Sequence, residues 1–162
     1  MNIVQVKKNR GMEDGLVWVE VYLPFDPSAF SEFQSLVTKA GSAVEAAKQN
    51  PDLANRALIP IDSHGEAMLQ DDVQTLAHRF ITKSRKHDIE HSEVVVDDVE
   101  TVESFINGPE VSSPHFYPGA WVVVLKVAKG SEAWDRINSG ELDAVSFQAF
   151  VKKQPIVARE AQ

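Results

Sequence analysis

The spacing of hydrophobic residues predicts several strands in this chain. Residues 15–24 (GLVWVEVYLP) partly alternate apolar and polar side chains and end at a proline, as a strand does. Residues 120–130 (AWVVVLKVAKG) are apolar nearly throughout, which is typical of a strand that is buried on both faces or closes a small barrel. Residues 92–106 supply one or two further strands, and residues 143–153 supply a final one.

The segment that follows the first predicted strand has the hydrophobic spacing of a helix. Residues 28–57 have apolar side chains three or four positions apart, with Gly41 inside the segment and Asn50-Pro51 near its end. This spacing predicts a helix that is either continuous or broken in two. Residues 57–66 (ALIPIDSHGE) are interpreted as a short apolar strand that runs into a polar turn.

Two more segments have the charges and caps of helices. Residues 69–86 begin with acidic side chains and end with basic ones, and their apolar positions share one helical face. Residues 131–142 form a predicted short helix that begins after Ser131 and ends at Gly140. The whole pattern predicts an α+β fold in which a small mixed or antiparallel, barrel-like sheet is surrounded by two or three helices.

Composition narrows the classes of function. The 162 residues suffice for one compact domain, and a net charge of −8 argues against binding to nucleic acid. Because the chain has no cysteine, a disulfide framework, a thiolate metal site and a cysteine nucleophile are excluded. The first residues lack the apolar core of a signal peptide, and no window resembles a membrane span. We therefore expect an intracellular, soluble protein without cofactor, metal or membrane partner.

The residues His91 and Ser146 are candidates for nucleophilic catalysis. A serine hydrolase needs a hydroxyl and a base that takes its proton, and residues distant in sequence can supply both from adjoining strands. His91 directly precedes the strand predicted from residue 92, and Ser146 lies within the last predicted strand. Residue types alone leave open the alternative that His91 is a strand-end histidine and Ser146 a small strand residue.

The blocks around these two residues resemble the XkdF-like branch of the phage prohead proteases. The shared features are an Asp-x-x-Gly-acid turn, a helix of the type "aahrF", an Asp-x-x-His segment, a W-V-x-V-K-V strand, a short helix with tryptophan and a G-E-L-x-G-F-S motif. In this chain they correspond to residues 62–66, 77–80, 88–91, 121–127, Trp134 and 140–146. The similarity extends over residues 58–150, more than half of the chain.

The resemblance implies a herpesvirus-assemblin-like fold and a serine endopeptidase. Such an enzyme cleaves phage scaffold and major capsid proteins inside the prohead, in the host cytoplasm, and a capsid role also implies self-association. Position by position, the resemblance makes Ser146 the nucleophile and His91 the general base. The third catalytic member is then Glu160, Asp88 or Glu93, or the site works as a dyad.

This chain differs from the family pattern in two features. Residues 28–57 have no counterpart and are interpreted as a helical insertion in a single domain of residues 1–162. The family has glycines around the serine, where this chain has Ala144-Val145-Ser146-Phe147. Because glycines let backbone N–H groups approach an oxyanion, their replacement favours an alternative function, a non-catalytic component of capsid assembly.

Other polar residues are weighed in the same way. His64 lies in a glycine-containing turn, where a solvated histidine is the more common case. The group His78, His87, Asp88, Glu90 and His91 lacks the spacing of a zinc site. The acidic pairs at 71–72 and 97–98 are interpreted as solvated charges, and a small-ligand-binding barrel has no residue-level support.

Overall fold

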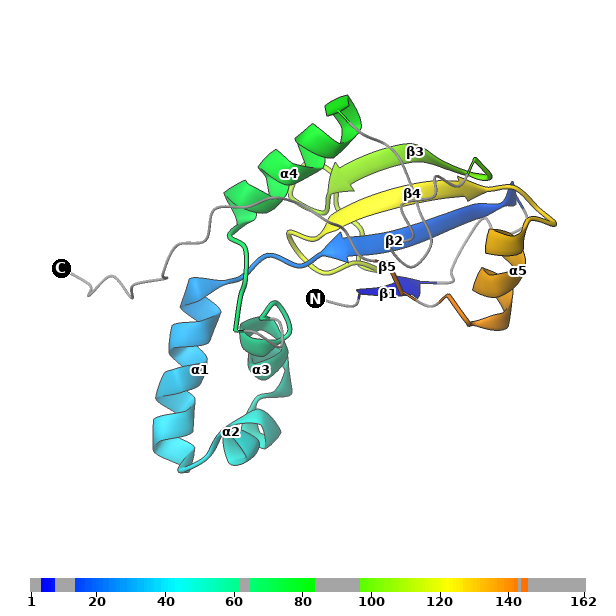
Figure 1. Cartoon of the computed structure of the whole chain (residues 1–162). Coiled ribbons are helices and arrows are strands. Elements are labelled where there is room, and N and C mark those ends of the chain that lie inside the picture. The colour runs from blue at the N-terminus through cyan, green and yellow to red at the C-terminus, as the bar shows by residue number, and fades with distance from the viewer. Residues whose placement is uncertain (1–3, 8–13, 62–64, 84–96, 143, 146–162) are drawn as a thin grey trace.

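The computed structural model describes residues 4–7, 14–61, 65–83, 97–142 and 144–145 (Figure 1). Its strands form one sheet with the order β3-β4-β2-β1-β5, and every neighbouring pair is antiparallel. The strands are β1 (Val4–Lys7), β2 (Leu16–Tyr22), β3 (Val99–Ile106), β4 (Trp121–Val127) and β5 (Ala144–Val145). The predicted α+β class is confirmed, but within these ranges the sheet is open, with β3 and β5 at its margins, and does not close into a barrel.

The central strand β4 organises the core. Trp121, Val122 and Val124 are at most 2% exposed, and the strand is buried on both faces, as its continuous apolar sequence predicts. One face packs against α4 (Gln70–Lys83) and α5 (Glu132–Ser139). The other face is covered by aromatic side chains of the loop at residues 108–119. Helices therefore cover one face of the sheet, and the loop covers the other face near Val122, together with Trp18 and Phe105.

The two helices that pack on the sheet agree with the sequence. Helix α4 carries its acidic residues in the first turn and Lys83 in the last, and Val73 and Ala77 are buried against the strands. Helix α5 begins after Ser131, whose side chain accepts a hydrogen bond from the backbone N–H of Trp134. It ends at Gly140, which has a φ of 82°, a left-handed conformation that glycine adopts without strain.

The segment between β2 and α4 is more broken than predicted. It forms α1 (Pro27–Ala40), α2 (Ala43–Gln49) and α3 (Pro51–Leu58), instead of one helix or two. Asn50 ends α2 and its side chain also caps α3, while Pro51 takes the first turn of α3, where its missing N–H costs nothing. The predicted strand near residues 57–66 is wrong, because its first residues complete α3 and Ile59 is 48% exposed.

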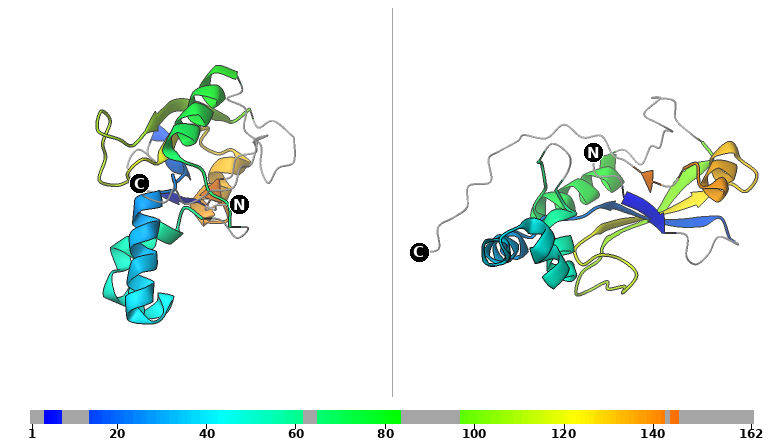
Figure 2. Two further views of the ribbon diagram at one scale, coloured as in Figure 1. Left: turned by 90° about the vertical axis from the view of Figure 1, so that its left-hand side faces the viewer. Right: turned by 90° about the horizontal axis from the view of Figure 1, so that it is seen from below.

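These three helices, residues 27–58, form a helical unit with a core of its own. Its buried side chains are Ala29, Phe33, Ala46, Leu53, Ala54 and Ala57. The unit extends from the end of β2, and α5 lies at the opposite end of the sheet (Figures 1 and 2). A backbone hydrogen bond from Phe25 to Met68 joins the chain entering the unit to the chain that leaves it.

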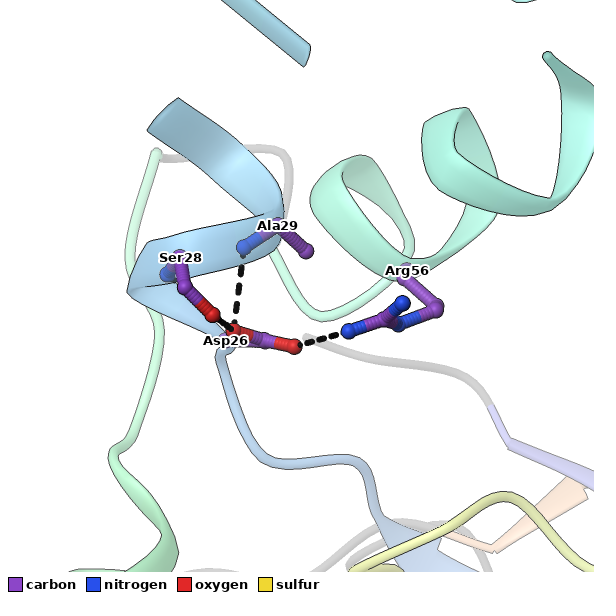
Figure 3. A network of polar contacts seen from close by, with 4 residues as sticks. All are labelled: Asp26, Ser28, Ala29 and Arg56. Carbon is purple, nitrogen blue, oxygen red and sulfur yellow. Dashed lines mark hydrogen bonds and ion pairs between the residues drawn. The ribbon is translucent and has the colours of Figure 1, made fainter. Parts of the chain in front are cut away.

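Asp26 fixes the base of the helical unit (Figure 3). Its Oδ1 accepts hydrogen bonds from the Ser28 hydroxyl at 2.6 Å and from the Ala29 backbone N–H at 3.0 Å. Its Oδ2 accepts one from Arg56 of α3 at 2.7 Å. The bond from Ser28, then that from Ala29, and finally Arg56 lower the pKa of Asp26 from 3.8 to about 2. One carboxylate therefore caps α1 and holds α3 beside it.

Replacing Asp26 by alanine should destabilise the protein. We expect Asp26→Ala to lower the free energy of unfolding by about 1–2 kcal/mol at pH 7, because α1 loses its N-cap. The folded pKa of Asp26 lies below its ordinary value of 3.8, so the carboxylate stabilises the fold above that pH. This contribution disappears as the pH falls through about 2. Urea denaturation followed by circular dichroism, at pH 7 and at pH 3, measures both effects.

Asp26→Asn is the matched control, because asparagine is also a good N-cap but has no charge to titrate. It should lose less stability than Asp26→Ala at pH 7 and should depend less on pH in the acid range than the wild type. Equal stability of the alanine and asparagine variants at pH 7 would contradict a capping role.

Candidate functional site

The residues predicted to carry catalysis lie outside the described residues. They are His91, Ser146, Glu160, Asp88 and Glu93, and their roles stay predictions. The same holds for His64, His87 and Glu90. The structure does describe α4 and β3, on either side of residues 84–96, and β5, which ends directly before Ser146.

The strand pairings place Val145, the residue before Ser146, at one end of the sheet. Val145 pairs with Val4 of β1. Since β1 is antiparallel to β2 and pairs Lys7 with Trp18, Val4 lies toward the last residue of β2, Tyr22. We call this the Tyr22 end of the sheet; it also contains Trp121 and Ile106, which pair across β2, β4 and β3. The start of β3, at Val99, lies at the opposite end beside Val127.

Asn107 organises a loop at the Tyr22 end. Its side chain is buried, and Nδ2 donates hydrogen bonds to the backbone carbonyls of Ser113, Phe116 and Tyr117 at 2.8–3.2 Å. Its Oδ1 accepts a bond of 2.7 Å from the Ser113 backbone N–H. One amide side chain therefore satisfies four backbone groups of the loop at residues 108–119, where no regular strand or helix does so.

Glu20 holds the same loop from the sheet. It lies on β2, is only 6% exposed, and its carboxylate accepts a hydrogen bond from the backbone N–H of Tyr117. The Tyr117 hydroxyl is itself buried without a hydrogen-bond partner among the described residues, and burial raises the pKa of Tyr117. Buried polar groups are costly, so this cluster marks a place where the fold maintains a particular loop geometry.

A small pocket opens between α4 and β3, also at the Tyr22 end. Its volume is about 210 Å³. The lining residues are Ala77, His78, Ile81 and Thr82 of α4 and Ser104, Phe105 and Ile106 of β3. The Ser104 hydroxyl accepts a hydrogen bond of 2.9 Å from the indole N–H of Trp121, which fixes the polar part of the wall.

The two acidic pairs predicted to be solvated are surface groups. Asp71 and Asp72 are exposed in the first turn of α4, which confirms their interpretation as solvated charges at a helix start. Asp97 and Asp98 are exposed as well. In the described part of the chain, no three His, Asp or Glu side chains are placed to hold a metal ion. No helix there is long and apolar enough to cross a membrane.

The sequence interpretation missed Glu20 and Asn107. A signal was present for Glu20, because it is the one charged residue within the otherwise apolar strand LVWVEVY. Asn107 follows a strand and precedes Gly108-Pro109, a pattern that predicts a turn but not the burial of the amide. Both residues act on backbone groups that come close only after the sheet forms.

Comparisons with known proteins find similarity in the part of the chain where the sequence motifs lie, residues 58–150. Residues 59–154 match the family described as "Putative phage serine protease XkdF". "Phage-like element PBSX protein XkdF" of Bacillus subtilis (strain 168) is 30% identical over 91 residues, or 53% of this chain and 31% of that protein. "Uncharacterized protein YqbD" of the same organism is 29% identical over 110 residues, which are 62% of this chain and 32% of that protein. The chain thus spans about a third of the curated relatives it matches, and no solved structure matches it.

Changing Asn107 should loosen the loop. Asn107→Asp keeps Oδ1 but replaces the donating amide by a carboxylate, so the backbone carbonyls of Ser113, Phe116 and Tyr117 each lose the hydrogen bond from Nδ2. We expect a loss of about 2–4 kcal/mol in the free energy of unfolding, together with faster proteolysis within residues 108–119. Urea denaturation and limited proteolysis with mass mapping provide the two measurements.

The exposed Asn55 of α3 allows the matched substitution, Asn55→Asp, which should change stability by less than about 0.5 kcal/mol. Wild-type stability and protease resistance of Asn107→Asp would show that the loop does not depend on the amide donors.

Proposed function

This chain belongs to the XkdF-type family of phage serine proteases, and from that membership we propose that it is a serine endopeptidase of capsid maturation. The observation that carries the proposal is the family match over residues 59–154, which includes both His91 and Ser146. The match covers more than half of the chain, and its range is close to residues 58–150, over which the motifs lie. The substrates proposed are the phage scaffold and the major capsid protein, within the prohead in the host cytoplasm.

The proposed chemistry is nucleophilic catalysis by a hydroxyl. Ser146 attacks the carbonyl carbon of the scissile peptide bond while His91 removes the hydroxyl proton. The same proton then passes from His91 to the amine that leaves, and water hydrolyses the acyl-enzyme. Glu160, Asp88 or Glu93 orients the histidine, unless the site works as a dyad. No metal or cofactor is needed for these steps.

We propose the herpesvirus assemblins as the wider superfamily, and this proposal rests on the sequence resemblance. The described sheet is antiparallel with helices on one face, but it is open and is not the barrel expected from the sequence. A protease that works within a capsid shell must also meet its substrates there. We therefore propose binding to scaffold and capsid protein, and self-association of the chain, as parts of the same function.

A second function is favoured by the sequence around the serine. Ala144 stands where relatives of the family have the glycine of their G-F-S motif, and a bulkier residue restricts the approach of backbone donors to an oxyanion. A chain with the family fold but without turnover would serve capsid assembly as a scaffold-binding or structural component. Labelling of the serine separates the two functions.

Intact-mass measurement after treatment with a fluorophosphonate tests the proposal. The wild type should gain one adduct, Ser146→Ala none, and His91→Ala should react at least about a hundredfold more slowly, because it lacks the general base. Ser139→Ala, which removes an exposed serine of α5, is the matched control and should react like the wild type.

Two results would reject the protease. Unchanged labelling of Ser146→Ala would show that another residue reacts. A folded wild type that gains no adduct would leave the non-catalytic role in capsid assembly as the better proposal.

A further inference from the structure

Asn107 is the one asparagine of the chain that glycine follows. An asparagine side chain is thermolabile, because the backbone nitrogen of the next residue can attack its amide carbon, Cγ. Glycine in that next position makes the attack easiest, since it has no Cβ and restricts the backbone least. The pair Asn107-Gly108 therefore has the chemistry of a spontaneous deamidation site.

The fold engages both reacting groups in other bonds. Asn107 is 5% exposed, and the four hydrogen bonds of its amide fix the orientation of Cγ. The backbone N–H of Gly108 donates to the carbonyl of Val111 at 2.9 Å, so the attacking nitrogen retains its proton. The reaction needs the two atoms in a near-attack arrangement, and these bonds oppose it. Deamidation therefore requires the loop at residues 108–119 to open.

The backbone does not require glycine at position 108. Gly108 is not among the described glycines with a positive φ. A Cβ added there would meet only the carbonyl oxygen of Ile106 at 3.9 Å, which is an ordinary contact. Pro109 favours an extended residue before it, and alanine adopts that conformation as well. The labile pair is therefore not the by-product of a turn that only glycine can make.

We propose that Asn107 is a latent modification site: the closed loop protects its amide, and opening of the loop lets it convert irreversibly to aspartate or isoaspartate. The Gly108 nitrogen loses its proton and bonds to Cγ of Asn107, and the bond from Cγ to Nδ2 breaks as ammonia leaves. Water then opens the succinimide ring at either carbonyl. No oxidant or reductant takes part. The inference does not rest on the protease proposal, because neither His91 nor Ser146 is involved.

The modified chain cannot restore the loop. Both products carry a carboxylate in place of the amide that donated to the carbonyls of Ser113, Phe116 and Tyr117. Isoaspartate also lengthens the backbone by one carbon atom. A transient opening is thereby recorded as a permanent loosening of the loop, which makes Asn107 a one-way switch at the Tyr22 end.

Deamidation rates of the full-length protein, measured by peptide mapping and mass spectrometry at mildly alkaline pH, test the proposal. In concentrated urea, Asn107 should react faster than every other asparagine of the chain. In buffer it should react at least about tenfold more slowly than in urea, because only the open fraction reacts. Gly108→Ala should fold and should slow the reaction in urea by about tenfold, since alanine restricts the approach of its nitrogen.

Two glutamate variants connect the reaction to the loop. Glu20→Ala removes the acceptor of the Tyr117 N–H, so the loop should be open more often and Asn107 should react at least about threefold faster in buffer. Glu103→Ala, which removes an exposed glutamate of β3, is the matched control and should react like the wild type. In urea the wild type and both variants should react at the same rate.

Three results would each overturn the latent site. They are equal rates for the wild type in buffer and in urea, a faster reaction of another asparagine in urea, and a buffer rate for Glu20→Ala that does not exceed that of Glu103→Ala. The comparison of buffer with urea uses the wild type alone, so it holds even if Glu20→Ala fails to fold.

Discussion

Burial of β4 on both faces is the constraint on which the rest of the structure depends. A strand whose valines point to both sides needs cover on both sides, and α4 and α5 supply only one layer. The second layer is a loop, which has no ladder of its own to satisfy its backbone groups. Asn107 and Glu20 satisfy them instead, so these two buried polar residues follow from the apolar strand beside them.

The chain enters and leaves the helical unit at adjacent points, so the unit does not interrupt the core around β4. Chain entry at Asp26 and chain exit after Arg56 are joined by an ion pair of 2.7 Å, and Phe25 and Met68 bond through their backbones. An inserted segment whose two ends are adjacent replaces a short connection without moving the strands on either side. The family match begins at residue 59, directly after α3. Because the match also leaves out β1 and β2, it does not test the interpretation of residues 28–57 as an insertion, which stays a prediction.

Local sequence patterns predicted the elements that have strong patterns of their own. Strands β2 and β4 and helices α4 and α5 were predicted because apolar spacing, end charges and caps all agreed for them. The four residues of β1, VQVK, alternate apolar and polar side chains, but so short an alternation is a weak signal, and their pairing with β2 and β5 defines them as a strand. The apolar residues near 57–61 misled the prediction, since hydrophobic content alone does not distinguish a strand from an exposed helix end. Roles for His91 and Ser146 came from family resemblance, and the described residues do not test them.

The distribution of polar groups in the sheet is uneven, and that asymmetry has a physical meaning. Glu20, Asn107 and the α4–β3 pocket all lie toward the Tyr22 end, where Val145 also pairs. Glu20 and Asn107 both satisfy backbone groups of the loop at residues 108–119, so the buried polar groups at this end fix the geometry of that loop. Their concentration at one end indicates that the fold preserves a defined surface there. Val145, the last described residue of β5, is held at this same end by its pairing with Val4 of β1.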